Sequence, residues 1–153
     1  ERLWHVPSQD NTDFDKALAM VCAPLILALG FTGARLDHTL AGMSTLVRNP
    51  QARVVVDAGV DLCFLAPPSL RLALPPKSRL SLFPMAPVRC KSEGLVWPTA
   101  GLAFDPVSMI GTSNMVAGGD VSLETAAPVM LVLVPAVSLE AVLAALSQSP
   151  RWP

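Results

Sequence analysis

Charged residues are scarce in this chain. They make up 15% of its 153 residues, and the formal net charge is −1. A protein with so small a net charge and no basic stripe lacks the electrostatic field that attracts nucleic acid or an anionic membrane. We therefore expect neither nucleic acid nor a membrane surface as a partner.

Cysteine and histidine are also few. Cys22, Cys63 and Cys90 are far apart and form no CxxC pair, and the two histidines add no zinc-ligand spacing. This pattern excludes a plausible zinc site. We expect three reduced, packed cysteines, which favours a cytoplasmic protein.

Long uninterrupted apolar runs are missing as well. Residues 17–32 carry no charge but contain Pro24 and Gly30, and residues 126–139 are broken by Pro128 and Pro135. A membrane-spanning helix needs roughly 20 apolar residues, so both stretches fit buried strands and helix faces better. The chain also has no Walker GxxxxGK[ST] loop, no GxGxxG after a strand and no HExxH.

Apolar residues nevertheless make up 52% of the chain, which favours a well-buried core. In the first part, helix and strand signals alternate. Thr12 is a candidate helix cap, residues 25–29 form a continuous apolar run typical of a buried parallel strand, and Asp37 opens a second helical pattern. The expected inward residues of that second helix are Leu36, Leu40, Met43 and Val47. Residues 53–56 and 61–65 indicate two more strands, and the whole pattern favours an α/β layer.

The pattern of apolar residues changes after Pro67 and Pro68. Alternating apolar residues at 70–74, 79–82 and 121–124, separated by proline and glycine turns, predict short strands of a β-sandwich. A final helix is expected at about residues 138–147. We therefore predict two domains, residues 1–66 and residues 67–153.

Two polar segments of the first part are candidate sites. Residues 9–14 (QDNTDF) and 33–38 (GARLDH) each place acidic side chains where a loop opens a helix, and the second adds Arg35. Loops at the carboxyl ends of strands bind ligands in α/β sheets. Carboxylates there can hold Mg²⁺ and an arginine can hold phosphate. Helix capping by Thr12 or Asp37, a solvated first turn at Asp13 and a local Arg35–Asp37 ion pair remain open as plain structural explanations.

A third polar segment, residues 111–114 (GTSN), lies within the apolar second part. It is either a tight turn held by side-chain hydrogen bonds or a ligand site. Hydroxyl and amide groups can both donate and accept hydrogen bonds, as the edge of an aminopyrimidine requires. Trp97, in the segment GLVWP, could stack on a ring or simply pack.

These segments resemble motifs of the thiamine pyrophosphokinase family. QDNTDF matches a QDxTDF-type motif, GARLDH a GxRxDH-type motif, GTSN a motif of the same type, and GLVWPT a GLxWPL-like segment with Thr99 where leucine is usual. The motifs occur in the family's order and the resemblance covers nearly the whole chain. Their spacing and the apolar composition look like those of a bacterial member. The resemblance implies a partial, Rossmann-like α/β catalytic layer followed by a β-sandwich thiamine-binding domain.

By this resemblance, the reaction moves pyrophosphate from ATP to the hydroxyl of thiamine, giving thiamine diphosphate and AMP. Asp13, Asp37 and Arg35 would be the catalytic residues, with Asp13 and Asp37 holding Mg²⁺. The remaining binding residues would be Gln9, Asp10, Thr12, Ser113 and Asn114. The family also implies a homodimer with sites formed between subunits.

The chain departs from the family pattern in one respect. Two acidic segments of the family, a DGGA-type turn and a GDFDS-type loop, are not found, and we expect them to lie before Glu1. The alternative is a non-catalytic thiamine-binding or sensing module that has lost these metal-binding loops.

Overall fold

A computed structural model describes residue 6, residues 10–33 and residues 35–153. The helices are α1 (Asp13–Ala19), α2 (Leu36–Arg48) and α3 (Leu139–Gln148), with a short 3-10 helix η1 (Ala136–Ser138) before α3. The strands are β1 (Ile26–Leu29), β2 (Val54–Asp57), β3 (Asp61–Leu65), β4 (Ser69–Ala73), β5 (Arg79–Pro84), β6 (Val88–Glu93), β7 (Ala103–Phe104), β8 (Gly111–Met115), β9 (Asp120–Thr125) and β10 (Met130–Pro135). In the described part of the chain, no helix has both the length and the apolar character that a membrane crossing requires.

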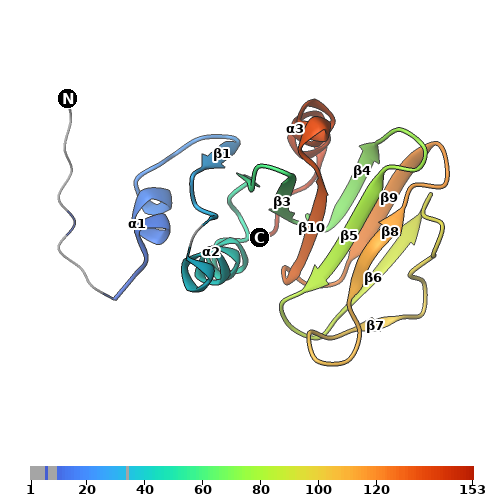
Figure 1. The fold of residues 1–153 in the computed structure, drawn as a ribbon, viewed down its shortest axis with the longest axis horizontal. Helices are drawn as coiled ribbons and strands as arrows, with labels where there is room; N and C mark the ends of the chain where they lie inside the picture. Colours follow the sequence, from blue (N-terminus) through green and yellow to red (C-terminus); the bar gives the residue numbers. More distant parts are fainter. Residues whose placement is uncertain (1–5, 7–9, 34) are drawn as a thin grey trace.

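The described strands form two sheets, and these confirm the expected α/β layer followed by antiparallel β-structure. The larger sheet has the order β1-β2-β3-β10-β5-β8, in which β1 and β2 are parallel and the other pairs are antiparallel. The smaller sheet is antiparallel, with the order β4-β9-β6-β7. In Figure 1, α1, α2 and β1 lie at one end of the molecule and the smaller sheet lies at the other.

The larger sheet crosses the predicted division at residues 66 and 67. Strand β10 lies between β3 and β5, with Leu131 opposite Leu65 on one side and opposite Phe83 on the other. Hydrogen bonding therefore continues from the first segment into the second. The two-domain division stays a prediction, and the segments that it separates share one sheet.

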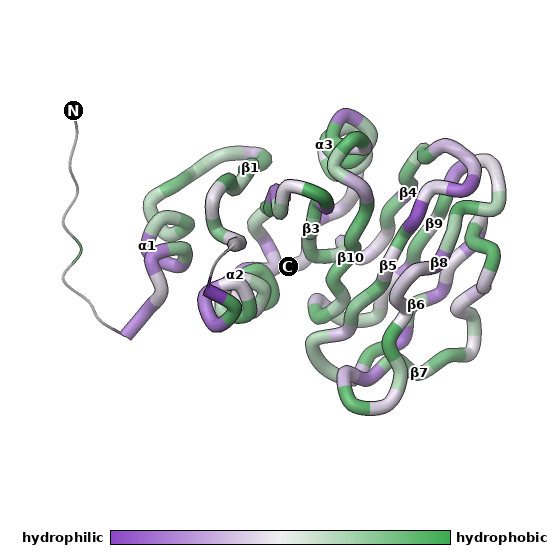
Figure 2. The backbone as a smooth tube through the Cα atoms, viewed as in Figure 1, coloured by the Kyte–Doolittle hydropathy of each residue, from purple (hydrophilic) through white to green (hydrophobic). Residues whose placement is uncertain are grey.

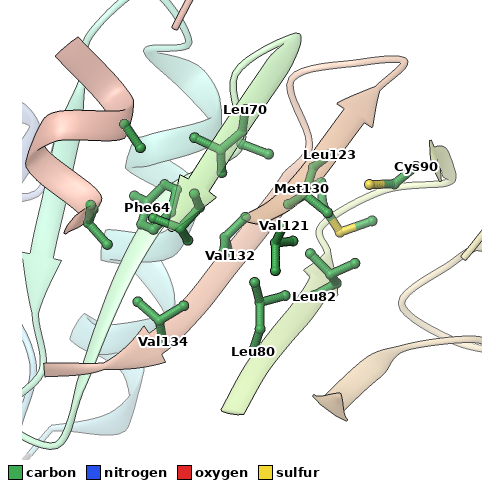
Figure 3. Close-up of a cluster of buried hydrophobic side chains, with 14 of the residues drawn as sticks. Phe64, Leu70, Leu80, Leu82, Cys90, Val121, Leu123, Met130, Val132 and Val134 are labelled. Atoms are coloured by element: carbon green, nitrogen blue, oxygen red, sulfur yellow. The ribbon is translucent and has the colours of Figure 1, made fainter. Parts of the chain in front are cut away.

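The main core lies between the two sheets and α3. Leu80, Leu82 and Val132 of the larger sheet meet Val121 and Leu123 of the smaller one, and all five are fully buried (Figure 3). Strand alternation explains the pattern, because every second residue of each strand points to the same side. This packing confirms the predicted sandwich.

A second core cluster lies under α1 and α2. Phe14 and Leu18 of α1 and Leu46 of α2 pack against the outer face of the larger sheet, where Val54 and Val56 are buried. The ring of Phe14 stacks on that of Phe31, with centroids 4.2 Å apart. Because β1 and β2 are parallel and joined by α2, the loop after β1 is brought beside the starts of both helices.

The predicted inward face of α2 is wrong in part. Leu36 is 70% exposed and Leu40 is 59% exposed, whereas Gly42, Thr45 and Leu46 are buried. Gly42 faces Phe14 of α1, where an added Cβ would make an ordinary contact at 3.5 Å, and Thr45 makes a hydrogen bond to α1. A pattern of apolar residues alone could not identify a glycine and a threonine as contact positions.

Candidate functional site

A polar pocket opens where β1 ends and where α1 and α2 begin. Its cavity has a volume of about 310 Å³. The lining residues come from three segments: Thr12, Asp13 and Phe14, then Gly30, Phe31, Thr32 and Gly33, then Arg35, His38 and Thr39. Figure 2 shows hydrophilic residues at the starts of both helices. We call this cavity the strand-end pocket.

The first wall of the strand-end pocket is the start of α1. Thr12 caps the helix in a capping box: its hydroxyl accepts from the backbone N–H of Asp15 (3.2 Å), and Asp15 accepts from the backbone N–H of Thr12 (3.2 Å). The next residue, Asp13, has a side chain that is 92% exposed and lies 3.6 Å from Nζ of Lys16. The cap thus explains the position of Thr12 and leaves the Asp13 carboxylate accessible at the pocket.

The second wall carries Arg35, whose guanidinium forms a bidentate pair with Asp37. Nε of Arg35 lies 3.2 Å from Oδ1 of Asp37, and Nη2 lies 2.6 Å from Oδ2. The hydrogen bonds from Arg35 lower the pKa of Asp37, and those to Asp37 raise the pKa of Arg35. Both side chains are about two-thirds exposed, so solvent competes with this pair and a ligand could replace either partner.

The structure therefore gathers some of the predicted site residues and not others. Thr12, Asp13 and Arg35 line the strand-end pocket, whereas Asp37 is joined to it through Arg35. Asp10 is exposed, precedes the capping box and is not among the lining residues. Gln9 lies outside the described residues.

Sequence reasoning missed part of the pocket lining. Phe31 and Thr32 follow β1 directly, and Thr39 lies one turn into α2. The signal that could have found the first two was their place after an apolar parallel strand, because such loops form ligand pockets in α/β sheets.

Ser113 and Asn114 are neighbours on β8 but line different cavities. Ser113 lines an apolar cavity of about 590 Å³, whereas Asn114 lines a smaller one of about 190 Å³ together with Trp97. Strand β8 is irregular here, because Ser113 has a φ of +60° and the register with β5 shifts between Leu80 and Leu82. Thr112 lines both cavities. The two predicted polar contacts therefore line neighbouring cavities rather than one.

The larger of these cavities lies on the face of the main sheet beyond α2. Helix α2 supplies one side of the lining (Leu40, Met43, Ser44), the sheet supplies the floor (Cys63, Arg79, Ser81, Phe83, Pro84, Leu131, Leu133), and loops and β8 close it (Met85, Pro106, Thr112, Ser113). Burial, with a smaller contribution from the charge of Asp61, raises the pKa of Cys63 to about 12. This thiol is therefore protonated and serves as apolar lining.

The side chain of Asn114 is occupied within the chain. Its Nδ2 donates to the backbone oxygen of Trp97 (2.7 Å), and its Oδ1 accepts from the backbone N–H groups of Trp97 (3.2 Å) and Met115 (2.8 Å). Asn114 is only 7% exposed, while Trp97 is 58% exposed. The amide thus holds the backbone at Trp97 against β8 and presents the indole ring at the surface.

The described residues contain no group of three or more His, Cys, Asp or Glu side chains that could hold a metal ion. Magnesium, however, is commonly bound by one or two carboxylates together with phosphate oxygens and water. The exposed Asp13 carboxylate at the strand-end pocket fits that smaller requirement. Asp37 fits it only after Arg35 has changed partner.

The fold and site define a class of protein: an α/β unit with acidic and basic side chains at a strand-end pocket, joined to an antiparallel unit with its own cavities. Residues 2–64 match a family model described as "Thiamin pyrophosphokinase, catalytic domain", and residues 71–130 match "Thiamin pyrophosphokinase, vitamin B1 binding domain". The chain belongs to the thiamin pyrophosphokinase family.

A curated relative supports this assignment. The chain is 28% identical over 133 residues to "Thiamine pyrophosphokinase 1" of Arabidopsis thaliana, and the match covers 76% of this chain and 50% of the relative. The chain therefore spans about half the length of the curated relative that it matches.

Solved structures have a similar fold. The chain is similar to thiamine pyrophosphokinase from Bacillus subtilis, with a TM-score of 0.70, 19% identity and coverage of 84% of this chain and 64% of that one. It is also similar to a protein from Lactobacillus plantarum, with a TM-score of 0.72, 20% identity and coverage of 84% and 65%. At these identities the likeness concerns the fold.

Proposed function

We propose that the protein is a thiamine pyrophosphokinase, which transfers pyrophosphate from ATP to the hydroxyl of thiamine and yields thiamine diphosphate and AMP. The observation that carries this proposal is the strand-end pocket, where Asp13 and Arg35 face one cavity in the segment that matches the catalytic family model. The following segment matches the vitamin B1 binding model, which supports thiamine as the acceptor.

Arg35 would bind the phosphates of the nucleotide. Its guanidinium has a planar set of donors that suits phosphate oxygens, and it is already exposed at the pocket. Thr12 lines the same cavity, with its hydroxyl engaged by Asp15. Transfer of a phosphoryl group depends mainly on position and on stabilisation of charge, and these residues would supply both.

Asp13 would be the carboxylate that meets Mg²⁺ on the nucleotide, and the ion would offset the negative charge of the phosphates. Asp37 would act after Arg35 turns toward phosphate, because both oxygens of Asp37 are now paired with that arginine. Once released, the Asp37 carboxylate would contact the metal or orient the attacking hydroxyl. This change of partner by Arg35 would make release of the Asp37 carboxylate depend on nucleotide binding.

Thiamine would be recognised by the second segment. The Ser113 hydroxyl lines the 590 Å³ cavity and is accessible to a ligand. Asn114 would contribute to thiamine binding by fixing the backbone of Trp97. It would also offer the ligand the second hydrogen of its side-chain amide, which these hydrogen bonds do not use. An exposed indole beside polar groups suits a flat heteroaromatic ring.

We further propose a homodimer with sites formed between subunits. The strand-end pocket and the GTSN segment line separate cavities in one chain. Large apolar side chains are exposed near the second site, including Trp97, Met109 and Ile110, and such residues are typical of interfaces. Sedimentation of the intact protein tests this proposal, and a strict monomer at micromolar concentration contradicts it.

The proposed activity is tested by an AMP-release assay on the full-length protein with ATP, Mg²⁺ and thiamine. We expect AMP and thiamine diphosphate in equal amounts, and none when thiamine or Mg²⁺ is omitted. Thiamine binding in calorimetry without any AMP release would instead support a non-catalytic thiamine-binding module. Absence of both would refute the assignment. Cys63 and Cys90 are buried as expected, whereas Cys22 is exposed, so the expectation of three packed cysteines is wrong for Cys22. Three free cysteines fit a reducing compartment, and we infer a cytoplasmic location.

A further inference from the structure

The position of α1 decides the shape of one wall of the strand-end pocket, because Thr12 and Asp13 both line it. Helix α1 has only seven residues. A helix of that length is not stable by itself in water. Its position therefore depends on the contacts that attach it to the rest of the molecule.

Asp15 makes the polar part of this attachment. Its Oδ2 accepts hydrogen bonds from the hydroxyl (2.7 Å) and the backbone N–H (3.2 Å) of Thr12. Its Oδ1 accepts from the Thr45 hydroxyl (2.8 Å) and from Nη2 of Arg48 (2.7 Å). One carboxylate thus joins a residue of the pocket wall to helix α2.

Thr45 and the Asp15 carboxylate are shielded from water in this junction, whereas the Arg48 side chain is 55% exposed. Thr45 is fully buried, and the Asp15 side chain is 13% exposed. Nη2 of Arg48 also donates to the Thr45 hydroxyl at 3.1 Å. The hydrogen bond between the buried Thr45 hydroxyl and the ionised Asp15 is charge-assisted, and in such surroundings it is stronger and more restrictive in geometry than an exposed ion pair. In the Lys16–Asp13 pair, by contrast, the Asp13 side chain is exposed, so this pair contributes little to the position of α1.

We propose that Asp15 is a positioning residue of the nucleotide site, which holds Thr12 and Asp13 in place by tying the start of α1 to Thr45 and Arg48. The proposal rests on the proposed function, because it assumes that the strand-end pocket takes the nucleotide. Loss of the junction loosens the α1 wall only, since Arg35 belongs to the α2 side and Ser113 to another cavity. Nucleotide binding should therefore weaken more than thiamine binding.

A matched pair of substitutions at Thr45 tests the proposal in the full-length protein. Thr45→Val removes the hydroxyl and keeps the volume, whereas Thr45→Ser keeps the hydroxyl. We expect Thr45→Val and Asp15→Asn to raise the KM for Mg²⁺–ATP about tenfold, with the KM for thiamine changed less than about twofold. Thr45→Ser should stay near wild type in both.

Arg53→Met is the control for a general loss of stability. It removes a hydrogen bond from Arg53 to the backbone oxygen of Ser149, and neither residue lines the strand-end pocket. We expect both KM values to stay at wild-type level. An unchanged KM for Mg²⁺–ATP in Asp15→Asn and Thr45→Val, or an equal rise for both substrates, would show a merely structural role and overturn the proposal.

Hydrogen–deuterium exchange separates failure of this proposal from failure of the proposed function. We expect faster exchange in residues 13–19 of Thr45→Val than of Thr45→Ser, with exchange in α3 unchanged. Unaltered exchange in residues 13–19 would overturn the junction itself. A wild-type protein that releases no AMP would refute the proposed function instead, and the positioning role would fall with it.

Discussion

At the scale of single residues, the exposed pair of Arg35 and Asp37 separates a catalytic role from a structural one. Asp37→Asn in the full-length protein should lower turnover about 100-fold or more, because a carboxylate needed for charge stabilisation is lost. The melting temperature should stay close to wild type, since exposed ion pairs stabilise little and both side chains are about two-thirds exposed. Steady-state kinetics and thermal unfolding measure the two effects.

Glu93→Gln is the control for this prediction. It removes a comparably exposed ion pair, with Lys91 at 3.6 Å, in the smaller sheet. We expect unchanged turnover and an unchanged melting temperature. Near-normal turnover of Asp37→Asn would remove this residue from the mechanism.

Gly94 is a residue-scale position where the backbone leaves no room for a side chain. Its φ is +80°, and a Cβ there would lie 2.4 Å from the backbone oxygen of Asp120. Gly94→Ala should lower the free energy of unfolding by about 2 kcal/mol or more, because a backbone atom must move and the left-handed conformation is unfavourable for alanine. Urea denaturation measures the loss.

Gly101→Ala separates these two causes. Gly101 has a similar φ of +85°, but a Cβ there meets nothing within 4 Å. The expected loss is about 1 kcal/mol, which is the conformational cost alone. Equal losses at the two positions would show that close approach to β9 plays no part.

At the scale of elements, the junction between α1 and α2 makes stability depend on acid pH. Burial raises the pKa of Asp15, but hydrogen bonds from Thr12, Arg48 and Thr45 outweigh it and hold the pKa at about 2, against an ordinary value of 3.8. The ionised form therefore stabilises the fold above about pH 4, and this contribution is lost as the pH falls from 3.8 toward 2.

The comparison of wild type with Asp15→Asn measures this contribution. We expect the difference in their free energies of unfolding to shrink by roughly 1 kcal/mol between about pH 5 and pH 2, because solvent screens part of the Arg48 charge. Urea denaturation at the two pH values provides the numbers. A difference that does not vary with pH would contradict the assigned cause.

Element-scale prediction from sequence succeeded where the signals are local. Thr12 and the acidic residues of the first turn correctly predicted the start of α1, and the apolar runs correctly predicted strands β1 and β10. The expected burial of β1 is wrong in part, because Leu27 and Leu29 are exposed. The prediction failed for the contact face of α2, where exposed Leu36 and Leu40 had been assigned to the core. The contact face of α2 is determined by Phe14 and Asp15 of α1. The sequence of α2 alone contains no information about these two partners.

At the scale of the whole molecule, the C-terminal tail ties the parts together. Nε1 of Trp152 donates to the backbone oxygen of Ala66 (2.9 Å), and Nη2 of Arg151 donates to that of Pro24 (3.0 Å). Trp152 also packs against the cluster under α1 and α2. A chain ending at Pro150 should lose about 2–3 kcal/mol of unfolding free energy, because a partly buried indole and two hydrogen bonds are removed.

Two variants provide reference values for the stability loss expected on truncation. Trp152→Phe keeps the ring packing and removes the hydrogen bond, so we expect a loss of about 1 kcal/mol. Val137→Ala changes a side chain that is 95% exposed and should alter stability by less than about 0.5 kcal/mol. If the truncated chain unfolds at the same urea concentration as the wild type, the tail does not stabilise the fold.

The sequence by itself determined the capped start of α1, the positions of the strands, the β-rich second half and the motifs that led to the family. These depend on residues within a few positions of one another, so local hydrogen bonding and periodicity suffice to predict them. The alternative cap by Asp37 is not found, because α2 follows Arg35 without a side-chain cap. The tertiary structure alone decided that β10 lies between β3 and β5, that Asp15 reaches Thr45, and that Ser113 and Asn114 serve different cavities. Partners in a ladder or a buried network come from distant parts of the chain, and their choice is made by packing energy rather than by local preference.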